Sequence, residues 1–234
     1  MIPYFYHENN SHHAPIHVLS QTGLSPHPDL SNRIDLIRDV FESRQIGKIG
    51  NVEKLDYNLL RKIHTDKYLN FLEGTAHSFV DNGYYFPLEF NSRPDARIMS
   101  EAGGLGHYCL DTNTPISINT YEHAISSCSL AYSAAVHIGN GGPAAYALCR
   151  PSGHHAMKNY MGGFCYLNNA AVCAQYLSDL GKVCILDLDF HHSNGTQDIF
   201  YDRGDVLTIS IHADCRRHPP YYWGFEDERG ACKG

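Results

Sequence analysis

Three side chains that can bind a metal or move protons stand at every second position after a short apolar run. The run is Val-Cys-Ile-Leu at 183–186, and the three residues are Asp187, Asp189 and His191. If the backbone stays extended, alternate side chains point to the same face of a strand. Two carboxylates and an imidazole placed together are costly to bury without a cation. The spacing predicts a divalent metal site, whereas a single residue of this kind would more simply cap a neighbouring loop.

A second polar pair, His154 and His155, follows an apolar segment at 144–149 that is predicted to be a buried strand. Ligand sites in parallel sheets lie at the carboxyl ends of strands, so both groups are expected at one edge. A metal held there would acidify a water and polarise a carbonyl, and a neutral histidine would take the proton. This set suits metal-assisted amide hydrolysis. Phe164, beside Gly163, is either an apolar wall for a slender acyl chain or a core aromatic at a tight turn.

The elements that must position these residues alternate along the chain. The continuous apolar run before Asp187 is typical of a strand buried on both faces. Strands that alternate with helices predict a parallel α/β sheet, and a chain of 234 residues is expected to form one domain, 1–234. Besides 144–149 and the stretch around 183–187, strands are predicted at 2–6 and 206–211, and helices between Ser31 and Gly47 and at 57–72 (with a restart at Thr65), 122–138, 168–180 and 194–200.

Composition narrows the class of protein. The formal net charge of −7 argues against nucleic acid as a general partner. The eight cysteines form no C-x-x-C pair, which argues against a zinc knuckle or a thioredoxin motif. No segment has the length of a membrane span, and the start lacks the features of a signal peptide, so we expect a reducing cytoplasm.

Four longer motifs resemble the histone deacetylase superfamily. They are RPSGHHA at 150–156, GGFCYLNNAA at 162–171, ILDLDFHHSNGTQDIFY at 185–201 and VLTISIH at 206–212. Segments 5–15 and 63–73 are similar to the bacterial acetylpolyamine amidohydrolase branch and to the class II enzymes. The resemblance implies an arginase-like three-layer α/β/α fold with a mainly parallel sheet. It also implies zinc-dependent release of acetate from an acetylated amine, either an acetylpolyamine or acetyl-lysine.

The resemblance further implies a role for each catalytic position. Asp189 and His191 are zinc ligands, and His155 is the general base. His154, backed by Asp187, is its electrostatic partner at the leaving amine. Asn194 stands behind His155, where some members of the superfamily carry Asp.

Other positions are implied to bind substrate or structural cations. Gly163, Phe164 and Tyr222 line the acyl-chain tunnel. Two structural monovalent-cation sites, with potassium as the expected ion, are implied. The first is at Asp187, Asp189, His191, Ser210 and Ile211, largely through backbone oxygens, and the second at Phe200, Arg203 and Val206.

The sequence also departs from related patterns. Ser193 stands where two-manganese ureohydrolases of the same fold carry the last Asp of Asp-x-His-x-Asp, so one metal is expected. The superfamily's third metal ligand, an Asp, and its transition-state hydroxyl, usually a Tyr, are expected beyond residue 234, which indicates a chain truncated at its C-terminal part. Two hypotheses follow: a deacetylase, or an inactive fragment that binds metal weakly or binds another protein.

The stretch 74–109 resembles the insert that, in the polyamine branch, helps to pair subunits and narrows the entrance to the site. A homodimer is therefore expected. Within this stretch Glu101 either attracts the distal ammonium of a substrate or is a solvated or structural carboxylate.

Overall fold

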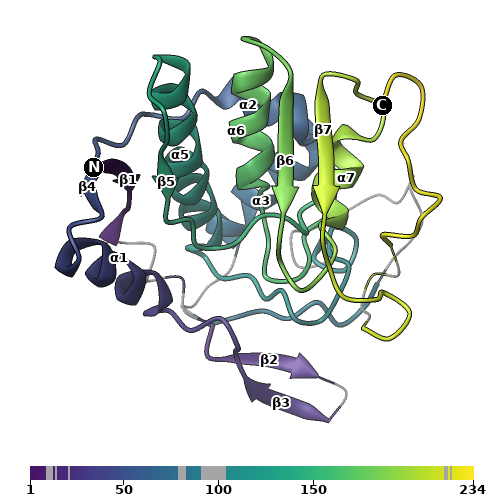
Figure 1. Ribbon diagram of the computed structural model, residues 1–234. Helices are drawn as coiled ribbons and strands as arrows, with labels where there is room; N and C mark the ends of the chain where they lie inside the picture. The colour runs from purple at the N-terminus through teal and green to yellow at the C-terminus, as the bar shows by residue number, and fades with distance from the viewer. Residues whose placement is uncertain are drawn as a thin grey trace.

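Parallel strands form the framework of the site. The computed structural model describes residues 1–8, 13, 15–20, 22–78, 83–90, 104–218, 221 and 223–234. Its strands are β1 (Ile2–Phe5), β2 (His17–Ser20), β3 (Gly23–Pro26), β4 (Gly47–Ile49), β5 (Tyr146–Ala147), β6 (Val183–Asp187) and β7 (Val206–Ser210). β1 pairs in parallel with β4 and β5, and β6 pairs in parallel with β7. β6 and β7 run in the same direction and end at the same edge (Figure 1). This pairing confirms the predicted α/β sheet.

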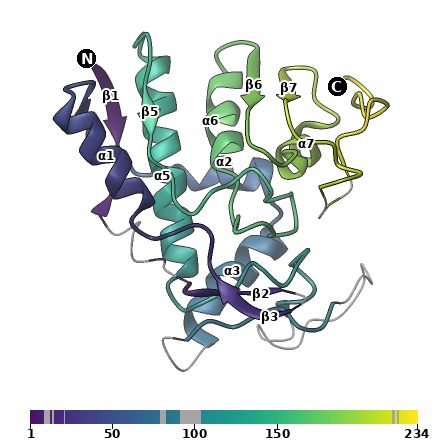
Figure 2. The same cartoon turned by 60° about the horizontal axis from the view of Figure 1, so that its bottom comes forward.

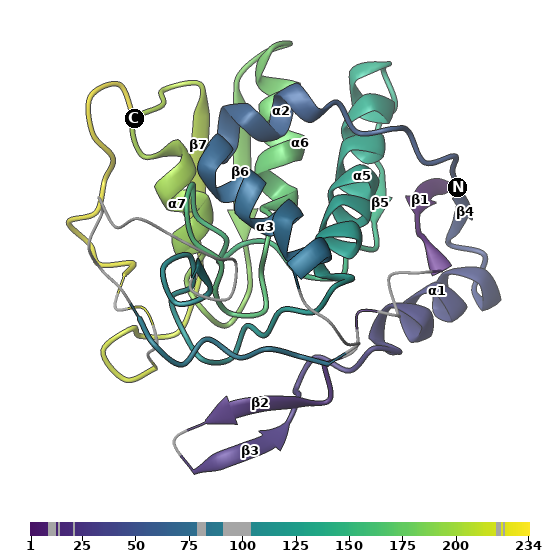
Figure 3. The ribbon, with the colours of Figure 1, turned by 180° about the vertical axis from the view of Figure 1, so that it is seen from behind.

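The described helices are α1 (Arg33–Ser43), α2 (Tyr57–Ile63), α3 (Asp66–Ser78), α5 (Thr120–Gly139), α6 (Asn169–Ser178) and α7 (Asn194–Phe200). Of these, α6 packs against β6 and α7 against β7, whereas α1 lies beside β1 and β4. Seen from behind, α2, α3, α5 and α6 lie in front of the strands (Figure 3), and α6 contacts both α5 and β6. The predicted break near Thr65 is confirmed, because the chain leaves the helical conformation between α2 and α3. Among the described ranges, no helix is long and apolar enough to cross a bilayer.

The main core lies between these helices and the strands. Leu60, Leu72, Cys128 and Val172 are fully buried in it, and each aliphatic side chain buried in this way contributes about 1.5–3 kcal/mol to folding. A smaller cluster holds α1 against β1, where the Tyr4 hydroxyl donates to a carboxylate of that helix.

The other face of β6 and β7 is open, so the prediction of a strand buried on both faces is wrong. Leu186, Leu207 and Ile209 are 55%, 60% and 41% exposed, and burial alternates along both strands. No helix of the described ranges covers this face, which lies toward the viewer in Figure 1. An apolar run shows that a strand can be buried on both faces, but a second layer must be present to bury it.

One local prediction also fails, and one element was not predicted. The segment 144–149 forms only the two-residue strand β5, and Tyr146 in it is 44% exposed. The hairpin of β2 and β3 was not predicted, because its strands are short and carry few apolar residues. It projects from the body of the molecule in Figure 1 and comes forward toward the viewer in Figure 2.

All eight cysteines are free thiols. Burial raises the pKa of Cys128 well above its ordinary value, so this thiol stays protonated and inert. Cys184, however, lies on the open face of β6 and is exposed.

Candidate active site

His154 and His155 lie in the loop that follows β5. Arg150 begins this loop and is 2% exposed. Its guanidinium pairs with the Asp29 carboxylate at 2.9 Å and donates to the backbone carbonyls of Asp29 and His13. A buried charge needs such partners, so the loop is joined to segments more than a hundred residues earlier in the chain.

The chain also turns sharply at the end of β6. The Asp187 carboxylate accepts from the backbone amide of Asp189 at 2.9 Å, and the Asp189 carboxylate accepts from the amide of His191 at 2.8 Å. The backbone therefore does not stay extended through His191, and the prediction that all three side chains share one strand face is wrong. Two successive side-chain-to-backbone turns instead send Asp187 toward His154 and leave Asp189 and His191 in the adjoining cavity.

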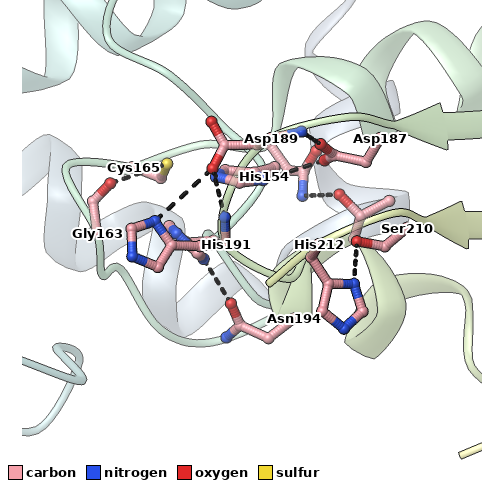
Figure 4. A network of polar contacts seen from close by, with 12 residues as sticks. His154, Gly163, Cys165, Asp187, Asp189, His191, Asn194, Ser210 and His212 are labelled. Atoms are coloured by element: carbon pink, nitrogen blue, oxygen red, sulfur yellow. Dashed lines mark hydrogen bonds and ion pairs between the residues drawn. The ribbon is translucent and has the colours of Figure 1, made fainter. Parts of the chain in front are cut away.

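Each imidazole of the pair has its own partner. His154 Nδ1 lies 3.0 Å from Asp187 Oδ2 (Figure 4). Burial alone would raise the pKa of Asp187, but hydrogen bonds from His154 and from the Asp189 amide outweigh it and lower this pKa. The pair therefore favours an ionised carboxylate beside His154.

His155 is oriented by Asn194 in α7. Its Nδ1 donates to Asn194 Oδ1 at 2.6 Å, which leaves Nε2 without the proton. Burial, and then the neighbouring His154 ring 4.0 Å away, lower the pKa of His155 to about 3. At neutral pH this imidazole is uncharged and able to accept a proton.

A cavity of about 430 Å³ opens over both imidazoles. Its lining residues are Pro28, Asp29, Arg33, Asp111, Asn113, Ser152, His154, His155, Gly163, Phe164, Asp189, His191 and Tyr221. Gly163 and Phe164 thus lie beside the histidines, where the resemblance placed the acyl tunnel. A Cβ added to Gly163 would lie 2.1 Å from His155 Cδ2, so only glycine allows this loop to approach the imidazole.

Asp189 and His191 are the donors available to a metal. Their side chains are 52% and 43% exposed in the cavity, and Asp189 Oδ1 lies 3.7 Å from His191 Nδ1 and 3.8 Å from His154 Nε2. A carboxylate and an imidazole are donor types that zinc uses, but a catalytic zinc takes three protein ligands. Within the described ranges no group of three His, Cys, Asp or Glu side chains is placed to hold a metal. The two donors fit a divalent metal in chemistry, and they would supply part of its shell.

The residues implied to bind monovalent cations lie near one another in two places. Asp187 and Ser210 are opposite each other at the ends of β6 and β7, and the Ile211 amide donates to the Asp187 carbonyl at 2.9 Å. Phe200 and Arg203 share a turn after α7, while Val206 begins β7. No cation is needed to explain these contacts, and the potassium sites stay predictions.

Tyr221 and Asp111 are among the lining residues that sequence reasoning missed. The ring of Tyr221 lies 4.8 Å from that of His155, and its hydroxyl donates to Asp111 Oδ2 at 2.5 Å. Burial, and then the Asp111 carboxylate, raise the pKa of Tyr221. The run Asp-Thr-Asn-Thr-Pro at 111–115 signals a turn, but not its contacts to residues far away in sequence. Tyr222, predicted to be a tunnel wall, and Glu101 lie outside the described residues.

Comparisons with known proteins agree with these features. A model of the histone deacetylase domain matches residues 27–234. Acetylpolyamine amidohydrolase 1 of Pseudomonas aeruginosa is 39% identical over 220 residues, which cover 90% of this chain and 64% of that protein. Acetylpolyamine amidohydrolase 2 of the same organism is 35% identical over 237 residues, which cover 98% of this chain and 69% of that protein.

A solved structure confirms the predicted fold. The crystal structure of acetylpolyamine aminohydrolase from Burkholderia pseudomallei matches with a TM-score of 0.93 and 32% sequence identity. The match covers 100% of this chain and 70% of that chain. The arginase- and deacetylase-like α/β fold is therefore correct. The present chain spans less than two thirds of the length of the first of these relatives.

Proposed function

Because the chain belongs to the histone deacetylase family, we propose that it hydrolyses the acetyl amide of a small acetylated amine. Water adds its oxygen to the acetyl carbon, the C–N bond breaks, and a proton is transferred to the departing amine. The observation that carries this proposal is the His155–Asn194 contact, which leaves a neutral imidazole with an unprotonated Nε2 in the cavity. A base of this kind can take the proton of the attacking water.

His154 has a different task in this proposal. Asp187 accepts from its Nδ1 and stabilises positive charge on the ring. Positive charge next to His155 favours the negative charge that develops on the substrate as water attacks. In this proposal His154 also donates a proton to the leaving amine.

Asp189 and His191 are proposed to hold zinc. A divalent ion there would polarise the acetyl carbonyl and make a nearby water more acidic. Gly163 and Phe164 are proposed to bind the acyl group, since Phe164 lines the cavity and its ring packs 4.5 Å from that of His27.

An acetylpolyamine is the favoured substrate class, because the two Pseudomonas aeruginosa relatives and the Burkholderia pseudomallei protein are named for that activity. Acetyl-lysine is the competitor, since it presents the same acetylated primary amine. An acetylated diamine and an acetyl-lysine peptide, assayed side by side, separate the two.

The test is acetate release from the acetylated diamine by zinc-loaded protein, measured for the unchanged chain, for His155→Ala and for His137→Ala. His137 is a matched control because it is a half-buried imidazole in the last turn of α5 and does not line the cavity. Loss of the base is expected to lower turnover by about 10²- to 10⁴-fold, with His137→Ala close to the unchanged protein. Equal activity in all three would refute the role of His155.

A non-catalytic role is the second candidate, and one observation favours it. The described residues supply two metal donors rather than three. No acetate release from a folded, zinc-loaded chain, together with zinc binding in the micromolar range or weaker, would support this candidate over the hydrolase.

A further inference from the structure

A single carboxylate collects four hydrogen bonds beside the cavity. Asp111 Oδ1 accepts from the Asn113 amide at 2.7 Å and from the Thr114 hydroxyl at 2.9 Å. Its Oδ2 accepts from the Gly163 amide at 2.7 Å and from the Tyr221 hydroxyl at 2.5 Å. All four partners are donors, which suits an ionised carboxylate, and such charge-assisted bonds are stronger than neutral ones.

The loop that Asp111 holds has an unusual backbone. Gly163 and Phe164 both have positive φ, at 54° and 68°, and a bulky residue in this region is strained. The Phe164 amide donates to the Thr114 hydroxyl at 3.1 Å, and that hydroxyl in turn donates to Asp111. The conformation that presses Gly163 against His155 therefore depends on Asp111 both directly and through Thr114.

The same oxygen also fixes the other side of the cavity. Tyr221 lies 110 residues from Asp111 in sequence, yet its hydroxyl shares Oδ2 with the Gly163 amide. The Tyr221 ring packs at 4.8 Å from His155, with an angle of 63° between the ring planes. One carboxylate thus joins the Gly163–Phe164 loop and Tyr221 on either side of the imidazole.

We propose that Asp111 is a positioning residue that sets the width of the acyl pocket, and with it the preference for acetyl over longer acyl groups. This inference rests on the proposed function. Asp111 acts through Gly163, Phe164 and Tyr221 and needs no contact with the reacting atoms.

The sharpest perturbation is Asp111→Asn. The side chain keeps its size, but an amide nitrogen replaces one carboxylate oxygen and cannot accept hydrogen bonds from the two donors that this oxygen served. Whichever way the asparagine amide is oriented, two of the four hydrogen bonds are lost, and its NH2 group faces two other donors. Tyr221→Phe removes only the bond to the tyrosine and leaves the Gly163 amide in place, so it should have part of the effect.

The first measurement compares kcat/KM for acetyl, propionyl and butyryl diamine substrates. In Asp111→Asn we expect the ratio of kcat/KM for acetyl to kcat/KM for butyryl to fall about tenfold, because two of the four bonds at Asp111 are lost and the pocket wall is held less firmly. Asp198→Asn is the matched control, because Asp198 is a partly buried carboxylate that accepts the Lys158 amide at 2.9 Å and does not line this cavity. An equal fall in rate for all three acyl groups would mean a purely structural role and would overturn the proposal.

The second measurement needs no substrate. Hydrogen–deuterium exchange of residues 162–165 is expected to accelerate at least about tenfold in Asp111→Asn and to stay unchanged in Asp198→Asn. Unchanged exchange in Asp111→Asn would overturn the inference even in an active enzyme. Accelerated exchange in a chain without turnover would count against the proposed hydrolase activity, while supporting the role of Asp111 in holding the loop at 162–165.

Discussion

Replacing Gly163 by alanine tests whether this loop positions His155. The new Cβ would lie 2.1 Å from His155 Cδ2 and 3.0 Å from its Nε2, far inside van der Waals contact. His155 has little freedom to retreat, because it is 5% exposed and bonded to Asn194. Either the imidazole or the loop must move.

The magnitude has two parts. A residue with a Cβ at the Gly163 φ of 54° costs about 1 kcal/mol, and forcing an extra methyl group into a packed site costs about 1–3 kcal/mol more. The free energy of unfolding should therefore fall by about 2–4 kcal/mol. Misplacement of the base by about 1 Å would lower kcat about a hundredfold.

Gly141→Ala separates these two parts. Gly141 also has positive φ, at 88°, but a Cβ there would meet nothing within 4 Å. Urea unfolding followed by circular dichroism should show a loss of only about 1 kcal/mol for this variant, with acetate release unchanged. Equal losses of stability in the two variants, with full activity in Gly163→Ala, would refute the claim that the loop presses on His155.

Three further predictions concern the pH dependence of stability, self-association and zinc affinity. Burial lowers the pKa of His64 from its ordinary 6.5 to about 4, so its contribution to stability is complete above pH 6.5 and is lost as pH falls toward 4. At about 1.4 kcal/mol per pKa unit, the free energy of unfolding should fall by about 3 kcal/mol. Urea unfolding at pH 7 and at pH 4.5 should show a smaller fall in His64→Gln than in the unchanged protein, since glutamine keeps an acceptor for the Asn168 amide. Equal falls in the two proteins would contradict this. Ile209→Lys places a charge on the exposed apolar face of β7 and should reduce self-association of the chain in sedimentation experiments. The free energy of unfolding should change by no more than about 0.5 kcal/mol. Undiminished association would show that copies of the chain do not meet through this face. Asp189→Asn should weaken zinc binding at least about tenfold by calorimetry, while the exposed Asp179→Asn should not, and equal affinities would remove Asp189 from the metal shell.

Much of the framework could be predicted from the sequence, because its signals are local. The helix predicted at 168–180 is α6 (Asn169–Ser178), and Asn168 caps it, with its side chain accepting from the Ala171 amide at 2.9 Å. α7 begins at Asn194 and ends at Phe200, as predicted. Helix caps and apolar periodicity are written within a few residues of one another, so a single sequence is enough to find them.

The details of the site depended on local turns that the apolar run did not reveal and on contacts between segments that are distant in sequence. The turns at Asp187 and Asp189 replace an extended strand, because each carboxylate bonds a backbone amide two residues ahead. Asp111 reaches Gly163 from 52 residues away and Tyr221 from 110. Such pairs form only once the fold has brought the loops together, so the motifs identified the histidines but not what holds the walls around them.

The buried contact of Arg150 bears on how much chain the site requires. The deacetylase domain model begins at residue 27, but the Arg150 guanidinium also donates to the carbonyl of His13. β1, at the very start of the chain, is the strand that joins β4 to β5, and β5 leads directly into Arg150. A protein cut back to the boundary of the domain model would keep the four long motifs and the Asp29 carboxylate, but it would lose one hydrogen-bond partner of the buried Arg150 together with the central strand of that small sheet. The folding unit that delivers His154 and His155 therefore extends beyond the recognisable domain, and expression boundaries chosen from motifs alone would remove part of what supports them.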